Sequence, residues 1–270
     1  MFSTERIVSI LVCALLLTAS FCARKQAANG YRIVSLSPAM TEILFSIGAG
    51  DKTVGVTTFC DFPAQAKIIT KVGDFSHPSI ERIVGLKPDL VIVNLPEQKR
   101  VKKELDKLNI ETFVSAPRSL SNIYHEISAL GTKLGLRRQA DSLVEYMMRN
   151  LEKVVPEHRV KIYVEISPRP IITIGADTFL NDLIHRAGGI NIFADLNKDY
   201  PVVGQETVIV RNPDIIIVLH PEDVTGRTGW HKVGAIMNGR VYTDLNQDYL
   251  MRPGPRLVEG YRQLVHIIND

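Results

Sequence analysis

The sequence contains little cysteine, no strong excess of charge and no familiar catalytic signature. Of the three cysteines, only Cys60 lies well beyond the N-terminal segment, so no internal disulfide framework is available. The formal net charge is only +3, and no basic stripe alternates with aromatic residues, which argues against nucleic acid as a partner. Phosphate-loop, His-Glu-x-x-His and Gly-x-Ser-x-Gly motifs are missing. Nothing in the sequence therefore indicates an enzyme.

Long hydrophobic runs are also scarce, and only Ile7–Phe21 stands out. This run is short for a membrane helix, which needs about 20 apolar residues, but it suits the apolar region of a secretory signal. We therefore predict a signal segment over residues 1–22 and a mature protein that is periplasmic or at the cell surface. Cys22 lies where a lipoprotein signal places its lipidated cysteine. Phe21 departs from the small residue usual before it, so simple cleavage is the alternative to a lipid anchor.

The chain contains an internal repeat. Residues 81–93 and 206–218 share a glutamate followed at the same interval by Pro-Asp and a β-branched apolar run. A looser echo relates residues 34–38 to residues 164–168. Because a period of about 125 residues is the size of a domain, the repeat predicts two similar lobes, which we place at residues 31–134 and 159–270.

Each copy has an α/β pattern. Leu90–Val93 and Ile215–Leu219 are typical of strands buried on both faces of a parallel sheet. Helices are expected over residues 79–85, 99–108, 206–211 and 255–268. Between the copies, apolar residues at helical spacing predict a single connecting helix over residues 137–155. The expected fold is thus two lobes with central, mostly parallel sheets, joined by one long helix. A ligand cleft should lie between the lobes, at the carboxyl ends of the strands.

Several segments together resemble one known family. They are Arg32–Pro38 with Thr41-Glu42, Val54–Pro63, Val72–Phe75, Gly239–Tyr242 and Arg252–Arg256. Over residues 31–268 the chain resembles periplasmic substrate-binding proteins of ABC importers, in the class that carries cobalamin, haem and ferric siderophores. Its cobalamin-binding members are the nearest match.

The resemblance implies a set of ligand-binding residues. Phe59, Phe75 and Tyr200 match aromatic positions that pack against the corrin, and Asp248 and Arg252 match polar positions of the final ligand loop. Met251 takes the place of an acidic residue there. Rigid aromatic side chains offer contact area at low entropic cost, and a few polar groups fix orientation. Cobalamin is the expected cargo, and neither a resident cofactor nor a metal is expected.

The same resemblance implies a partner. Glu81 and Glu206 match two surface glutamates, one on each lobe, that meet arginines of the membrane permease. The alternative to this docking role is a local one, in which each glutamate interacts with the positive end of a helix dipole, since each opens a short predicted helix. The protein is expected to act as a monomer.

Other hypotheses about the ligand and the function stay open. Haem would require an axial tyrosine, histidine or methionine, and a ferric siderophore would favour clustered arginines. His77 and His220 lie near predicted strand ends, but no cluster of ligands surrounds them. An extracytoplasmic α/β enzyme with an unrecognised site, or a structural lipoprotein, would belong to a different functional class.

Overall fold

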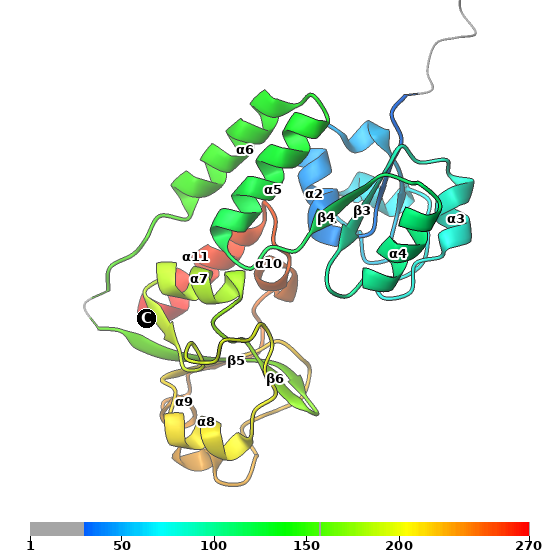
Figure 1. Ribbon diagram of the computed structural model, residues 1–270. Coiled ribbons are helices and arrows are strands. Elements are labelled where there is room, and N and C mark those ends of the chain that lie inside the picture. The colour runs from blue at the N-terminus through cyan, green and yellow to red at the C-terminus, as the bar shows by residue number, and fades with distance from the viewer. Residues whose placement is uncertain (1–29, 157, 270) are drawn as a thin grey trace, which may run out of the picture.

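Two lobes make up the computed structural model, which describes residues 30–156 and 158–269 (Figure 1). The predicted signal segment and Cys22 lie outside those residues. None of the described helices has the length and apolar character needed to cross a bilayer.

The N-terminal lobe is built on a parallel sheet of order β2-β1-β3-β4. Its strands are β1 (Ile33–Ser35), β2 (Thr53–Val56), β3 (Leu90–Asn94) and β4 (Thr112–Ser115). Its helices are α2 (Pro38–Ser46), α3 (Ile80–Gly85), α4 (Lys99–Lys107) and α5 (Leu120–Lys133), with short 3-10 turns at Gly50–Lys52 and Ala64–Ile68. All of β3 except Asn94 is fully buried, as its continuous apolar run predicts.

The C-terminal lobe repeats this topology. Its strands are β5 (Val160–Pro168), β6 (Ile171–Thr173), β7 (Gly189–Asn191), β8 (Ile215–Val218) and β9 (Val241–Tyr242). Its helices are α7 (Phe179–Arg186), α8 (Gln205–Arg211), α9 (Gly234–Met237), α10 (Gln247–Met251) and α11 (Leu257–Asn269), with a 3-10 turn at Trp230–Lys232. The parallel strands run β7-β5-β8-β9, which matches β2-β1-β3-β4, and β6 adds an antiparallel pairing on β5. The predicted α/β fold with mostly parallel sheets is confirmed.

The Pro-Asp pair of the repeat has the same structural task in both lobes. Asp89 accepts a hydrogen bond from the backbone N–H of Arg32 at 2.7 Å, and Asp214 accepts one from the N–H of Lys161 at 2.8 Å. Both contacts hold the amino end of the central strand to its neighbour. The repeat in the sequence thus encodes a repeated strand junction.

The looser echo of residues 34–38 and 164–168 does not correspond to the same structure in the two lobes. In the first copy, Ser37 accepts a hydrogen bond from the N–H of Met40 and caps α2. In the second copy, β5 continues to Pro168 and turns back through β6, so α7 begins only at Phe179. A hairpin therefore separates strand and helix in the C-terminal lobe.

The connecting helix is shorter than predicted. Helix α6 spans Arg137–Asn150, whereas the apolar spacing indicates a helix to residue 155. Beyond Leu151 the segment is held by contacts with α7 and α11. The N–H of Val154 donates to the carbonyl of Arg186 at 2.8 Å, and the Arg186 guanidinium donates to the carbonyl of Leu151 at 3.0 Å. Leu151 is buried and Val154 is partly buried, so both fit a helical stripe, but Leu151 caps α6 and Val154 lies in the non-helical segment that follows.

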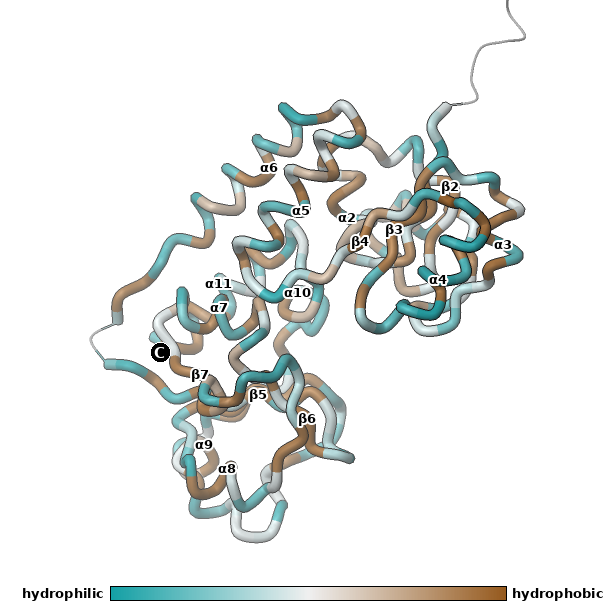
Figure 2. The backbone as a smooth tube through the Cα atoms, in the orientation of Figure 1, coloured by the Kyte–Doolittle hydropathy of each residue, from teal (hydrophilic) through white to brown (hydrophobic). Residues whose placement is uncertain are grey.

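One hydrophobic cluster runs through both lobes. It joins residues of β1 and α2 to residues of α5, α6, α7, β5, β8 and α11, while separate clusters lie on the outer face of each sheet. Figure 2 shows the apolar strands inside and the polar surface of α4 outside. A shared core of this kind favours small movements of the lobes over a wide hinge opening.

Candidate functional site

The loops that carry Phe59 and Phe75 lie side by side at one edge of the N-terminal sheet. The N–H of Thr58 donates to the carbonyl of Gly73 at 2.9 Å and joins the two loops. Phe59 keeps 55% of its surface exposed, and Phe75 is partly buried. The structure therefore brings together the two loops that carry these predicted ligand residues.

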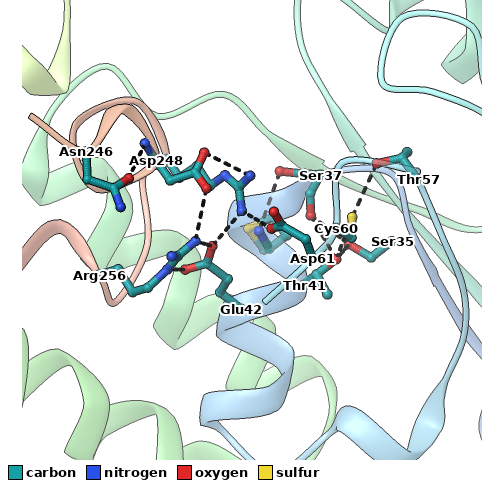
Figure 3. Close-up of polar contacts among 12 residues, drawn as sticks. Ser35, Ser37, Thr41, Glu42, Thr57, Cys60, Asp61, Asn246, Asp248 and Arg256 are labelled. Atoms are coloured by element: carbon teal, nitrogen blue, oxygen red, sulfur yellow. Dashed lines mark hydrogen bonds and ion pairs between the residues drawn. The ribbon is translucent and has the colours of Figure 1, made fainter. Parts of the chain in front are cut away.

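A buried polar chain supports the Phe59 loop from below (Figure 3). The hydroxyl of Thr41 lies within hydrogen-bonding distance of Ser35 Oγ, at 2.9 Å, and of Cys60 Sγ, at 3.2 Å. The hydroxyl of Thr57 lies 3.3 Å from the same sulfur, and Lys71 Nζ donates to the carbonyl of Cys60 at 3.0 Å. Cys60 is buried and serves as a packing and hydrogen-bonding residue under the loop.

Tyr200 belongs to the C-terminal lobe and faces the N-terminal one. Asp199 beside it forms a 3.1 Å ion pair with Arg118, which follows β4. Tyr200 keeps 43% of its surface exposed. Burial of the rest of the side chain, together with the carboxylates of Glu97 and Asp199, raises the pKa of Tyr200 to about 12. Because Glu97 belongs to the turn after β3, Tyr200 lies across the junction of the lobes.

Asp248 and Arg252 belong to an ionic cluster that crosses the lobes. Figure 3 shows Asp248 and Arg256 of one lobe next to Glu42 and Asp61 of the other. Arg252 donates to Asp248 at 2.9 Å, to Asp61 at 2.7 Å and to Glu42 at 3.2 Å. Arg256 grips the buried Glu42 through two donors, at 2.9 and 2.5 Å. The final ligand loop is therefore attached to α2 and to the Phe59 loop of the other lobe.

Both arginines of this cluster are neutralised by protein carboxylates. The Arg256 guanidinium also covers the ring of Phe62 at 4.3 Å. Burial lowers the pKa of each arginine, but the bonds to Glu42 and Asp61 outweigh this effect and raise both pKa values overall, so both side chains stay charged. The cluster contains three carboxylates and two guanidiniums, and it does not attract anions as free arginines do.

The two predicted histidine positions differ in their availability. His220 Nε2 lies 2.8 Å from the buried carboxylate of Glu165, and its Nδ1 accepts the N–H of Glu222 at 3.2 Å. Both ring nitrogens are thus in use. The side chain of His77 is 86% exposed and its Nδ1 lies 3.4 Å from Asp74. No group of histidine, cysteine or acidic residues that could hold a metal occurs among residues 30–156 and 158–269.

Glu81 and Glu206 occupy equivalent places. Each lies exposed in the first turn of a short helix, α3 or α8, just before the repeated strand junction. Figure 1 shows these helices on separate lobes, both away from α6. Neither carboxylate forms an ion pair with any described residue, so both remain available to a partner.

Acid is expected to destabilise the protein through Glu165 and Asp61. Burial raises the pKa of each carboxyl, but the bonds from Arg227 and Arg252 outweigh it and hold both pKa values below 4.5 and 3.8, their ordinary values. A carboxyl with a lowered folded pKa stabilises the fold above its unfolded pKa and loses that contribution as the pH falls. Urea unfolding from pH 7 to pH 3 should show a constant free energy of unfolding above about pH 5 and a steep fall below it. The Asp61→Asn variant should fall less steeply, and an identical slope would contradict this assignment.

Comparisons with known proteins place the chain in a family. The family model described as periplasmic binding protein matches residues 33–247. The chain belongs to the periplasmic binding protein family. This periplasmic binding protein is 33% identical over 252 residues to the uncharacterized ABC transporter substrate-binding lipoprotein YvrC of Bacillus subtilis, with 88% of its own chain and 79% of the relative covered.

Two further similarities concern named ligands. The chain is 30% identical to a vitamin B12-binding protein of Vibrio cholerae, and 96% of each chain is covered. It also resembles the crystal structure of a possible iron-binding (periplasmic solute-binding) protein of Staphylococcus epidermidis. That match has a TM-score of 0.78 and 31% identity, and it covers 89% of this chain and 99% of the other.

Sequence reasoning missed three buried polar residues. Glu42 and Gln98 hold the loops of the candidate site, and Glu165 binds Arg227 within the C-terminal lobe. For two of them the sequence signal was position, with Glu42 inside an apolar helix and Glu165 inside an apolar strand. A charged residue at a core position indicates a buried partner, but the sequence does not identify that partner.

Proposed function

We propose that this protein is an extracytoplasmic solute-binding protein that captures cobalamin, or a related corrinoid, and delivers it to the permease of an ABC importer. The observation that carries the proposal is that aromatic residues lie on both lobes, with Phe59 and Phe75 on joined loops of one lobe and Tyr200 on the other, near Glu97. The arginines of the ionic cluster between the lobes are already neutralised by carboxylates. The predicted domain limits, the monomeric state, the lipid anchor at Cys22 and the five ligand residues are part of this proposal.

The chemistry of the ligand suits this arrangement. A corrin is large, with apolar faces and a rim of neutral amides. Aromatic rings can cover its faces, and hydrogen-bonding groups such as Asp248 can meet its amides. A cluster with more carboxylates than guanidiniums tolerates neutral amides better than the carboxylates of an anionic ligand.

Haem or a ferric siderophore is the second candidate, and the similarity to the Staphylococcus epidermidis protein favours it. Two features of the described chain oppose it. Both nitrogens of His220 are occupied. Arg252 and Arg256 are committed to Glu42, so they offer little charge to an anionic siderophore.

Delivery would begin with docking of the loaded protein. Glu81 and Glu206 present one carboxylate on each lobe, which suits a partner with two basic patches. Such surface charges steer association and fix the orientation of the complex more than they add affinity. ATP hydrolysis in the importer would then drive release into the permease.

Ligand capture can be tested directly. The mature protein is incubated separately with cyanocobalamin, haemin and a ferric hydroxamate, desalted, and examined by absorption spectroscopy. We expect the corrin spectrum to co-elute with the protein at a stoichiometry near one. If haemin or the ferric hydroxamate co-elutes and cyanocobalamin does not, the proposed ligand is wrong and the co-eluting compound takes its place. If none of the three is retained, an enzyme or a structural protein is favoured.

A further inference from the structure

Gln98 is a fully buried amide in the turn between β3 and α4. Its Oε1 accepts the backbone N–H of Asn94 at 2.8 Å, which closes the turn. Its Nε2 donates to the carbonyl of Leu36 at 2.9 Å and to the carbonyl of Phe75 at 2.8 Å. One side chain therefore joins the ends of β1 and β3 to the tip of the Phe75 loop, and it uses its full set of donors.

The Phe75 loop is already shaped before Gln98 reaches it. Gly73 pairs with Pro78 across its base, and Asp74 Oδ1 accepts the N–H groups of Ser76 and His77 at 2.8 and 2.6 Å. Gly73 has a φ of +128°, and a Cβ there would lie 2.6 Å from the carbonyl oxygen of His77. The loop is thus a preformed unit, and Gln98 fixes how that unit sits on the lobe.

The geometry points to Gln98 as a positioning residue that orients Phe75 for the ligand. The carbonyl carbon and Cβ of Phe75 are bonded to the same Cα. Fixing the direction of the carbonyl group therefore limits the directions in which the aromatic ring can point. The same turn carries Glu97, which faces Tyr200 across the lobes. Gln98 thereby fixes the position of Phe75 relative to the turn that lies near Tyr200. A site that is preorganised in this way loses less conformational entropy on binding. This role rests on the proposed ligand site.

A double-mutant cycle separates positioning from general support. Gln98→Leu removes the amide at similar volume, and Phe75→Ala removes the ring on which it acts. With cyanocobalamin we expect Kd to rise about tenfold in Gln98→Leu and on the order of thirtyfold in Phe75→Ala. In the double variant, Kd should stay within about twofold of Phe75→Ala, because residues that act through one contact are not additive. Independent, multiplied effects would overturn the inference.

Two variants guard against a trivial loss of stability. Thr53→Val removes a buried hydroxyl bond to the Ala49 carbonyl at the amino end of β2, away from the ligand loops. It should leave Kd unchanged at a comparable loss of thermal stability. Gln98→Glu keeps the acceptor for Asn94 but places an oxygen against two carbonyls, and it should raise Kd like Gln98→Leu.

Hydrogen exchange makes the test independent of the ligand's identity. Amides 74–77 should exchange faster in Gln98→Leu than in Thr53→Val, without any ligand present. If cyanocobalamin fails to bind the unmodified protein, the ligand proposal fails, and the cycle is repeated with whichever of haemin or the ferric hydroxamate co-elutes. Unchanged exchange at these amides would overturn the role of Gln98 in either case.

Discussion

Reversing the charge of both Glu81 and Glu206 to lysine is expected to reduce ligand uptake by cells by about 100-fold. Both side chains are exposed and unpaired among the described residues, and each opens a helix on a different lobe. If they meet basic groups on the permease, the substitutions turn two attractions into two repulsions, each costing on the order of 1–2 kcal/mol at an exposed rim. Uptake of labelled cyanocobalamin in cells that depend on this protein measures the effect.

The matched control changes the net charge equally at a distant place. Glu145→Lys together with Glu152→Lys alters exposed residues on and just after α6, away from α3 and α8 (Figure 1). Uptake with this control should stay within about twofold of the unmodified protein, since long-range charge effects are screened beyond a Debye length of about 8 Å. The Glu81 and Glu206 variant should bind ligand normally in solution. Normal uptake by it would exclude the proposed docking role.

Removing the carboxylate of Glu165 is expected to destabilise the protein by about 3–5 kcal/mol. Glu165 is fully buried, accepts two bonds from Arg227 at 2.7 and 2.6 Å, and accepts the hydroxyl of Tyr163 at 2.7 Å. In Glu165→Leu the guanidinium of Arg227 keeps its charge and loses its partner. Guanidinium chloride unfolding, followed by circular dichroism, should show a lower midpoint with an unchanged slope.

Two comparisons identify the cause of this loss. The double variant Glu165→Leu with Arg227→Met replaces the whole pair by apolar groups and should recover most of the stability, because no charge is left unpaired. Asp106→Ala breaks the exposed 2.8 Å pair with Lys102 on α4 and should cost less than about 1 kcal/mol. Equal losses from Asp106→Ala and Glu165→Leu would mean that burial does not set the cost.

Local patterns in the sequence predicted much of the fold. The apolar runs of β3 and β8 predicted buried parallel strands, and the repeat around them predicted two similar lobes, because these features depend on neighbours along the chain. The strand junction made by each Pro-Asp pair was seen only in the structure. The end of α6 was predicted five residues too late. Leu151 and Val154 suit a helical stripe, and only tertiary contacts with Arg186 of α7 and Tyr261 of α11 accompany the end of the helix.

The candidate site divides in the same way. The sequence by itself determined the α/β lobes, their repetition, the exposed glutamate that opens a helix in each copy, and the aromatic loops at 59 and 75. Only the tertiary structure decided that Arg252 is bound by Glu42 and Asp61, that His220 is fully occupied, and that Gln98 holds Phe75. Arg252 and Glu42 are 210 residues apart. Periodicity and motifs describe neighbours along the chain, whereas a buried charge or amide takes its partner from whichever segment the folded core brings within hydrogen-bonding distance.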